Sequence, residues 1–376
     1  MGIIMTDNPF KYGIVVTGDD FVNRKEEIEI LTKELSSGKS IILYSERRLG
    51  KTSLLMEFIT QKTKGMIPVY IDLYGMTTKE DLARQIVNNV VNSSYSNLDK
   101  IKNAVKNYFI NLKPKMIISA DGKITLDLSA KKTYDEDELV EILDFSEKVA
   151  KDKKKRIIMV FDEFQEIALI DGLKMEKLMR SRFQHHKNVS YVFVGSKEHL
   201  LRQMFEEETR AFFKFARPLS LGPIPKGEFT PFIIQKFKQT NKKVSNEVIE
   251  EVLNFTHGHP YFTQYLCHEI WYINKSAKDE DVIGTAIKNI IAQQSIAFEH
   301  IWDELKSRNQ RALLSGIAYE GLHNYSPDFI EKYNLKSQSH VEKSLQMLKN
   351  KGILDENGQI IDIFFKEWVI MKTRRL

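Results

Sequence analysis

Residues 45–52 read Ser45-Glu46-Arg47-Arg48-Leu49-Gly50-Lys51-Thr52, and this stretch decides the fold. An apolar run at residues 40–44 leads into it, and an amphipathic segment at residues 53–59 leads out of it. A turn between a strand and a helix directs backbone N–H groups and the helix N-terminus at one point, which creates an anion site. Lys51 supplies a cation for the β- and γ-phosphates, and Thr52 supplies a hydroxyl for Mg²⁺. We therefore predict a loop that binds a nucleoside triphosphate.

One letter departs from the phosphate-loop pattern G-x-x-x-x-G-K-[ST], because Ser45 stands at the first glycine. Serine is small enough for the corner between strand and loop, and Gly50-Lys51-Thr52 is intact. A working phosphate loop is the favoured reading, and an ordinary glycine-containing connection between a strand and a helix is the alternative. A second motif is needed to decide between them.

The second motif is a strand that ends in two acids, Arg156-Ile157-Ile158-Met159-Val160-Phe161-Asp162-Glu163. Its apolar and β-branched run predicts a central parallel strand, and open α/β sheets bind ligands at the carboxyl ends of such strands. Asp162 would hold the Mg²⁺ shell opposite Thr52, while Glu163 would orient or deprotonate the attacking water. An acid pair that merely caps the next helix is the alternative. With a phosphate loop upstream, the two motifs reinforce each other.

A third strand, Ser190-Tyr191-Val192-Phe193-Val194-Gly195-Ser196, ends in a small polar residue. A hydroxyl at this place could contact the γ-phosphate or the attacking water, which makes Ser196 a candidate sensor. The alternative is an N-cap for the helix expected at residues 197–205. One hydroxyl can serve both roles, so both stay open.

The order of several motifs resembles the archaeal-type ATPase family, which belongs to the STAND branch of the AAA+ class. The matching stretches are Asn8-Pro9-Phe10, residues 21–28, residues 47–55, Asp162-Glu163-Phe164-Gln165, Val194-Gly195-Ser196 and Gly258-His259-Pro260-Tyr261. The resemblance covers nearly the whole chain, from about Asn8 to the last segment. The family usually has Gly-Pro where this chain has Ser45-Glu46, and Gly where it has Asn23. Because Glu46 adds a negative charge near the phosphates unless it points away, a low rate of ATP hydrolysis is expected.

This resemblance implies further site residues. Arg24 is the polar candidate beside the adenine, Pro260 would lie against the adenine, and His259 would report the state of the phosphates. An arginine from a neighbouring molecule could complete the site, with Arg210 and Arg217 as candidates. The expected nucleotide-binding set is Ser45, Arg47, Arg48, Leu49, Gly50, Lys51, Thr52, Ser53, Arg24, Pro260 and His259, with Thr52 and Asp162 for Mg²⁺ and Glu163, Asp162, Ser196, Arg210 and Arg217 in catalysis.

Length and composition fit a multi-domain soluble protein. At 376 residues the chain exceeds what one core usually fills, and 42% hydrophobic with 28% charged residues is typical of a globular chain. No apolar run approaches the roughly 20 residues that span a bilayer, and no signal peptide opens the chain, so we expect a cytoplasmic protein. Cys267 stands alone, which excludes an internal disulfide.

We expect an α/β fold with three parts: a P-loop parallel-sheet ATPase core at residues 1–223, a helical lid at 224–294 and a winged-helix domain at 295–376. An inserted β-hairpin is expected near residues 114–130, because Asp121-Gly122 separates two alternating runs. The hairpin is either a decoration of the core or a docking element for a partner. The lysine-rich run at 151–156 is interpreted as a solvated loop.

The last segment shows the pattern of a winged helix. Ser337 or Ser339 would cap a helix with Val341, Leu345 and Leu348 on one face, and the runs 353–354 and 360–363 would flank an Asn357-Gly358 turn as the wing. The opposite helical face carries Gln338, His340, Lys343, Gln346, Lys349 and Asn350, with Glu342 as the discordant charge. This face could enter a DNA major groove or could help to lock a resting state.

The sequence thus predicts a slow Mg-ATPase switch, in which bound ATP or ADP sets how lid and winged helix dock on the core and a partner reads that state. The rival prediction is a nucleotide-stabilised, winged-helix DNA-binding regulator that barely hydrolyses ATP. The partners considered are another protein, double-stranded DNA and a second copy of the chain. No association with a membrane is expected.

Overall fold

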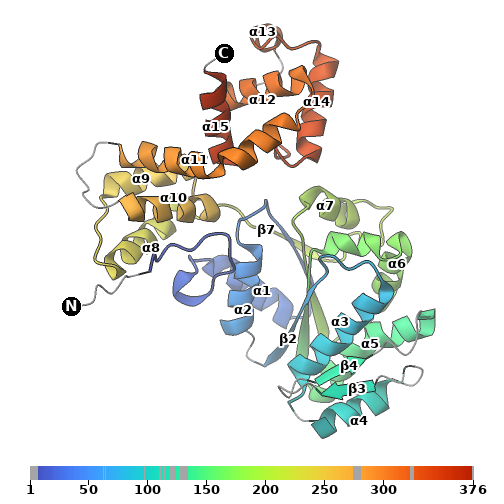
Figure 1. Ribbon diagram of the computed structural model, residues 1–376. Helices are drawn as coiled ribbons and strands as arrows, with labels where there is room; N and C mark the ends of the chain where they lie inside the picture. Colours follow the sequence, from blue (N-terminus) through green and yellow to red (C-terminus); the bar gives the residue numbers. More distant parts are fainter. Residues whose placement is uncertain are drawn as a thin grey trace. The chain divides into compact units, whose positions relative to one another are not determined.

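The computed structural model describes residues 7–61, 63, 65–96, 98–109, 112, 115–118, 124–127, 134–273, 281–321 and 326–374. The chain forms two compact units (Figure 1). One is Val15–Gly222, and the other joins the residues before Val15 to Pro223–Leu376. Each unit is considered by itself below.

The first unit is built on a parallel sheet in the order β2-β5-β6-β1-β7. The strands are β1 (Ile41–Tyr44), β2 (Met66–Asp72), β5 (Arg156–Asp162), β6 (Val189–Val194) and β7 (Arg217–Ser220). Strands β1 and β6 are buried at every position, and β5 at every position after Arg156, because helices cover both faces of the sheet. Since the strands are parallel, their carboxyl ends lie along one edge, as the motif positions require.

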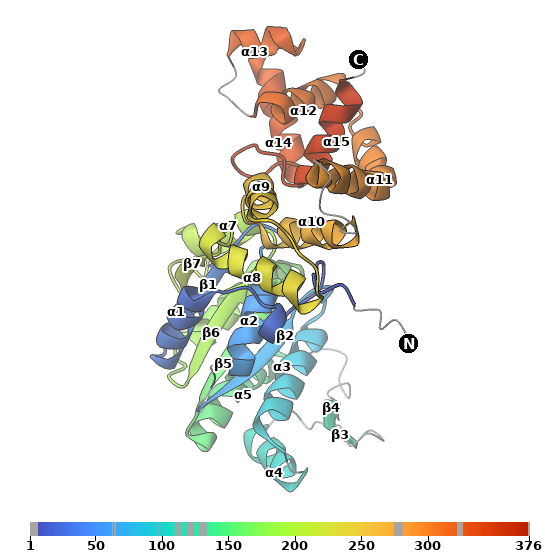
Figure 2. The same ribbon diagram turned by 90° about the vertical axis from the view of Figure 1, so that its left-hand side faces the viewer.

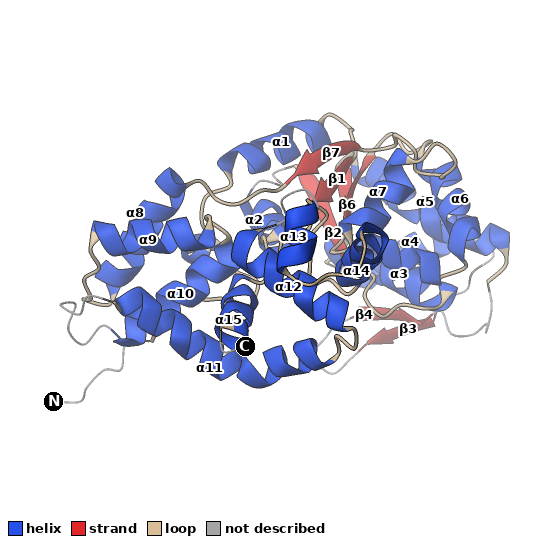
Figure 3. Cartoon of the chain, turned by 90° about the horizontal axis from the view of Figure 1, so that it is seen from above, coloured by secondary structure: helices blue, strands red, loops and turns tan. Residues whose placement is uncertain are grey.

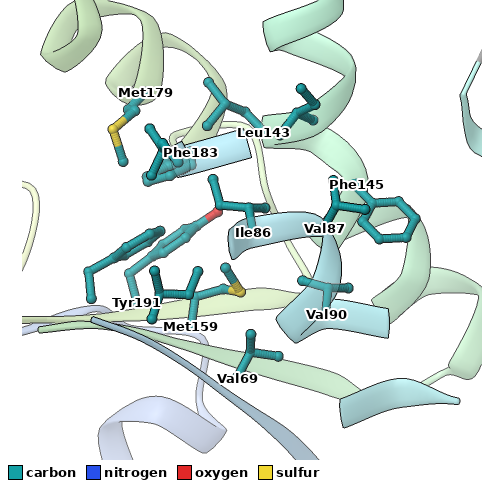
Figure 4. Close-up of a cluster of buried hydrophobic side chains, with 14 of the residues drawn as sticks. Val69, Ile86, Val87, Val90, Leu143, Phe145, Met159, Met179, Phe183 and Tyr191 are labelled. Atoms are coloured by element: carbon teal, nitrogen blue, oxygen red, sulfur yellow. The ribbon is translucent and has the colours of Figure 1, made fainter. Parts of the chain in front are cut away.

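Two groups of helices cover the sheet (Figure 1). Helices α1 (Lys25–Ser36) and α2 (Lys51–Gln61) pack on one face through Leu31, Leu35, Leu54 and Phe58. The other face carries α3 (Lys79–Ser94), α5 (Glu136–Lys153), α6 (Gly172–Phe183) and α7 (Glu198–Glu206). Figure 4 shows part of that core, where Val69, Met159 and Tyr191 from three strands meet Ile86 and Leu143 from α3 and α5. Two short 3₁₀ helices, η1 (Gly18–Asp20) and η2 (Phe164–Leu169), complete the unit.

The segment between β2 and β5 contains the predicted insertion. Helix α4 (Leu98–Tyr108) is followed by β3 (Lys115–Ile118) and β4 (Ile124–Asp127), which pair antiparallel and confirm the hairpin (Figure 2). The side chain of Asn88 on α3 anchors it, since its amide donates to Leu126 O at 3.2 Å and its oxygen accepts from Leu126 N at 2.7 Å. The Asp121-Gly122 turn lies outside the described residues.

The second unit is helical apart from one β-bridge, within the residues that the structure describes (Figure 3). Polar caps begin several helices: Ser245 begins α9, Asp281 begins α11, and Ser326 followed by Pro327 begins α13. The helices are α8 (Lys226–Gln239), α9 (Asn246–Thr256), α10 (Pro260–Ile273), α11 (Val282–Asp303), α12 (Arg308–Glu320), α13 (Pro327–Lys332), α14 (Gln338–Asn350) and α15 (Ile363–Thr373).

Two expected domain limits differ from the division into compact units. Residues 7–14 group with the second unit, because the amide of Asn8 donates to His268 O at 3.0 Å and the ring of Tyr12 stacks on Tyr265 at 4.1 Å. The expected limit between 294 and 295 falls within α11, a continuous 22-residue helix. Lid and winged helix are therefore parts of one compact unit.

The wing is smaller than predicted. A single antiparallel bridge joins Leu354 to Ile360, and the expected strand at 360–363 does not continue. The reason is Asp362, whose carboxylate accepts hydrogen bonds from Phe364 N and Phe365 N and so begins α15. At the other end of the motif, Ser337 occupies the N-cap position of α14, but its hydroxyl contacts Ser339 and His340 instead of a helix N–H.

Candidate active site

The loop at 45–50 connects the end of β1 to the start of α2, as predicted. Gly50 has a φ of 88°, a left-handed conformation that favours glycine and turns the chain into the helix. The side chain of Leu49 is buried in the core, whereas Arg47 and Arg48 are exposed. Leu49 therefore anchors the loop through its side chain, and only its backbone is available to a ligand.

Lys51 is held by the loop that precedes it. Its ammonium donates to Ser45 O at 3.0 Å, to Ser45 Oγ at 2.9 Å and to Glu46 O at 3.0 Å. Burial lowers the pKa of Lys51, and the nearby carboxylates of Glu163 and Asp162 oppose that shift. A phosphate would therefore have to compete with three oxygens of the protein for this cation.

Ser45 is buried and links Lys51 to the loop, since its hydroxyl also donates to Glu46 O at 2.9 Å. We expect Ser45→Gly to leave ATP affinity within about threefold, or about 0.65 kcal/mol, because the two carbonyl contacts to Lys51 remain and backbone N–H groups hold the phosphates. Isothermal titration measures this, with Ser45→Ala separating loss of the hydroxyl from gain of glycine flexibility. A tenfold loss in both variants would show instead that the hydroxyl replaces a contact that the usual glycine loop makes elsewhere.

Thr52 and Asp162 lie together at the carboxyl edge of the sheet. Thr52 Oγ1 donates to Asp162 Oδ2 at 3.2 Å, and the hydroxyl of Tyr70 on the neighbouring strand β2 donates to the same oxygen. Burial raises the pKa of Asp162, while the hydrogen bond from Tyr70 counteracts the rise. Burial beside Asp162 also raises the pKa of Tyr70, so this phenol remains a donor.

These oxygens fit Mg²⁺. A hydroxyl and a carboxylate are hard donors of the kind Mg²⁺ uses together with water and phosphate oxygens. A buried carboxylate whose pKa is raised also gains from a neighbouring cation, which would stabilise its ionised form. Thr52 and Asp162 are therefore the residues that would hold the ion.

Glu163 and Ser196 are also brought together. Glu163 Oε2 accepts hydrogen bonds from Ser196 N at 3.1 Å, from Ser196 Oγ at 2.8 Å and from the amide of Gln165 at 2.5 Å. Glu163 itself has a left-handed backbone with φ 52°, and its side chain caps no helix. Helix α7 begins after Lys197, so Ser196 is not its N-cap either. Both capping alternatives are therefore wrong.

Two family models match the sequence of the chain. The model described as an ATPase domain predominantly from Archaea matches residues 21–266. The chain belongs to this archaeal ATPase family. A second model, described as a probable winged helix domain, matches residues 296–371. An uncharacterised ATP-binding protein of Methanocaldococcus jannaschii is 49% identical over 53 residues, which are 14% of this chain and 83% of that protein.

Solved structures share the fold of this family member. A Walker-type ATPase of Pyrococcus abyssi has a TM-score of 0.66 at 20% identity, over 96% of this chain and 99% of that one. The ORC2 protein of Aeropyrum pernix, solved in ADPNP–ADP complexes, has a TM-score of 0.56 at 11% identity, over 99% of both chains. The predicted class is confirmed: a parallel-sheet ATPase core with a helical lid and a C-terminal winged helix, in a member of this ATPase domain family. No described helix is both long and apolar enough to cross a membrane.

Two predicted nucleotide contacts of the ATPase have structural partners within the first unit. The buried guanidinium of Arg24 pairs with Glu27 at 2.9 Å and donates to Leu49 O at 3.3 Å and Gly222 O at 2.7 Å. Ser53 Oγ accepts a hydrogen bond from Val16 N at 3.1 Å. These side chains brace the phosphate loop, which differs from the direct contact expected for Arg24.

The predicted lid residues lie at the start of α10. Gly258 has a φ of 72°, and a Cβ there would lie 2.2 Å from Ile224 O, so the close approach requires glycine. Pro260 is the first residue of α10, and the ring of His259 lies 4.4 Å from that of Phe262. Contact of Pro260 or His259 with a nucleotide remains a prediction.

The two arginine candidates differ in availability. Arg210 pairs with the buried Glu176, to which its Nε donates at 3.2 Å, so it is committed within its own chain. Withdrawing it would leave a buried carboxylate unpaired, which typically costs about 3–5 kcal/mol. A role of Arg210 in a neighbouring site, which remains a prediction, would therefore require this ion pair to break. Arg217 is exposed, pairs with Glu34, and stands at the amino end of β7, away from the edge that carries its own phosphate loop.

Sequence reasoning missed Tyr70 and Gln165. In the parallel register of β2 and β5, Asp72 lies beside Asp162. Tyr70 is two residues before Asp72, so its side chain points to the same face of the sheet. Knowing that β2 pairs with β5 would therefore have placed the phenol close to Asp162. Gln165 is buried against Gly195, where a Cβ would lie 2.0 Å from its Oε1. The glycine before Ser196 was the available signal, since it permits this close approach.

Proposed function

We propose that this archaeal ATPase is a slow Mg-ATP-hydrolysing switch of the STAND type, whose nucleotide state is read by a partner. The observation that carries the proposal is the position of Glu163. Its Oε2 accepts three hydrogen bonds from Ser196 and Gln165, so the expected base is held by the protein before it meets a substrate. Lys51 is similarly held by its own loop.

In this proposal the residues act in sequence. Backbone N–H groups of the loop and Lys51 bind the phosphates, and Thr52 with Asp162 holds Mg²⁺, which when bound neutralises charge that develops on the phosphates. Ser196 shares its donors between Glu163 and the γ-phosphate. When the γ-phosphate draws Ser196 away, Glu163 becomes free to orient or deprotonate the attacking water. The hydrogen bonds that must first be exchanged account for slow turnover.

The switch requires that nucleotide state changes how the second unit docks on the first. The two-unit division of the chain supports this requirement, since lid and winged helix form one compact body that can respond together. Either a protein partner or a second copy of the chain could read the change, and the exposed Arg217 is the more available arginine candidate for completing a neighbouring site.

Small-angle scattering tests the switch. We expect the radius of gyration of Glu163→Gln with Mg-ATP to differ from that of the same variant with Mg-ADP, because the variant retains the γ-phosphate. Lys51→Ala, which lacks the phosphate cation, serves as the control and should give one profile in both nucleotides. Identical profiles for ATP and ADP in Glu163→Gln, at saturation confirmed by titration, would rule the switch out.

A DNA-binding regulator is the second candidate, favoured by the outer face of α14. Gln338, His340, Lys343 and Gln346 are exposed, while Val341 and Leu348 pack inward. A polar, partly basic helix face of this kind suits a major groove. Sequence-dependent duplex binding that Lys343→Gln weakens, combined with negligible ATP turnover, would favour this candidate over the switch.

A further inference from the structure

The amino-terminal edge of the core sheet carries a line of cations. The strands are parallel, so their first residues lie along one edge, opposite the edge that carries the phosphate loop. In spatial order, Lys155 precedes β5 and Arg156 begins it, Lys187 precedes β6, Lys39 precedes β1 and Arg217 begins β7.

Direct contacts show that these cations are neighbours. Arg156 Nη1 donates to Lys187 O at 3.2 Å. On the side of β1, a Cβ built at Gly38 would lie 3.3 Å from the guanidinium of Arg156. Lys39 follows Gly38 directly, so it is also close to Arg156. The contacts therefore join the starts of β5, β6 and β1 into one surface, which we call the basic edge: Lys39, Lys153, Lys154, Lys155, Arg156, Lys187 and Arg217.

The end of α5 extends the basic edge toward α4. Lys153 Nζ lies 3.8 Å from the centre of the Tyr95 ring. Burial lowers the pKa of Lys153, the nearby charges of Lys100 and Lys155 lower it further, and the charge of Asp152 opposes the shift. Lysines from two helices and a loop thus crowd one another.

The acids nearby offset this charge only in part. Glu34 is paired with Arg217, and Asp152 lies near Lys153. Glu147 keeps its negative charge while it accepts hydrogen bonds from Asn188 N at 2.9 Å and Nδ2 at 2.7 Å. Among the described residues, Lys39, Lys155 and Lys187 have no carboxylate within ion-pair distance. Helices α1 and α5 end here, but a helix C-terminus offers only about half a negative charge each. The seven cations of the basic edge exceed the three acids named here by four, whereas in the whole chain 56 Lys and Arg stand against 51 Asp and Glu.

We propose that the basic edge binds the phosphate backbone of double-stranded DNA. From β5 to β7 the edge spans three strand spacings, about 14 Å, and each strand of B-DNA carries about four phosphates along that length of helix axis. Lysines act as point charges toward phosphate and carry no sequence readout. An acidic protein fits less well, because no large apolar side chain exposed in the described residues lies in these segments to form the centre of a protein interface.

This inference goes beyond the proposed switch and does not depend on it. The basic edge and the phosphate loop are at opposite ends of the strands, so DNA binding and ATP binding can be measured and lost separately. It also differs from the winged-helix candidate, whose face is on α14 in the other unit.

Fluorescence anisotropy with a labelled duplex of about 20 base pairs tests the proposal, at salt concentrations from about 50 to 200 mM. The test variant is Lys39→Gln/Lys155→Gln/Lys187→Gln, and the matched control is Lys336→Gln/Lys343→Gln/Lys349→Gln in the winged helix. We expect the test variant to bind at least tenfold more weakly at the lowest salt, and its slope of log affinity against log salt to become shallower by about 2.7, which is about 0.9 for each lost phosphate contact. The control variant should keep at least half of the wild-type affinity.

ATP titration of both triple variants reports folding, and unchanged ATP affinity is expected because neither set touches the phosphate loop. Absence of wild-type duplex binding at the lowest salt would overturn the proposal. So would an equal loss in both variants, or a loss confined to the winged-helix control.

Discussion

Lys51→Ala is expected to lower ATP affinity at least a hundredfold. The buried ammonium now has three oxygen partners, and in the complex it would exchange them for the β- and γ-phosphates. A hydrogen bond to a charged group contributes about 1.5–3 kcal/mol, so loss of two such bonds exceeds the approximately 2.7 kcal/mol of a hundredfold change. Isothermal titration with Mg-ATP measures the effect directly.

Lys79→Ala is the matched control for loss of a positive charge. Lys79 is the first residue of α3, pairs with Asp171 at 2.5 Å and does not contact the phosphate loop. It should bind ATP as the wild type does. If Lys51→Ala also kept wild-type affinity, residues 45–52 would be an ordinary connection between strand and helix, and the assignment of the site would be wrong.

Glu163→Gln is expected to keep ATP binding and to lower turnover by roughly 100-fold or more, the scale for losing a general base. The amide has nearly the same shape and can still accept from Ser196, so the surroundings of Glu163 should persist. Phosphate release at saturating Mg-ATP gives the rate, and titration of the same preparation confirms binding.

Glu166→Gln provides the comparison, since Glu166 lies in η2 just after Glu163 and pairs with Lys197 at 3.2 Å. Its turnover should stay within about twofold of wild type, because an ion pair with one exposed partner contributes only about 1 kcal/mol. Equal turnover in wild type and Glu163→Gln would remove Glu163 from catalysis and would leave it only a structural partner of Ser196.

The central sheet and the phosphate loop could be predicted because their signals are local. An apolar run, a glycine and a lysine in fixed order determine the strand, turn and helix at residues 41–61 with few alternatives. The hairpin at β3 and β4 followed from alternation around a turn in the same way. The strand that ends at Asp162 could be predicted from its apolar and β-branched composition. A role for Asp162 and Glu163 in nucleotide chemistry could be predicted only because a phosphate loop precedes them in the chain.

Contacts between distant segments could not be predicted. Tyr70 meets Asp162 across 92 residues, and its place depends on which strands are neighbours. The ion pair of Arg210 with Glu176 on α6 joins residues 34 positions apart, and its formation depends on how α6 packs beside the segment after α7. At Asp362 a local signal was misread, since the same aspartate that could end a wing strand can also cap a helix.

The grouping of residues 7–14 with the C-terminal unit matters for anyone who divides this protein into fragments. A fragment cut at the natural boundary, 223–376, would lack Phe10 and Tyr12, whose rings lie 4.9 Å from Phe237 and 4.1 Å from Tyr265. Without Phe10 and Tyr12, the rings of Phe237 and Tyr265 would be more exposed to water, which promotes aggregation. A fragment that keeps residues 7–14, joined to 223–376 by a flexible linker, would retain these aromatic contacts, and a tag fused close to Asn8 would disturb helices far along the sequence.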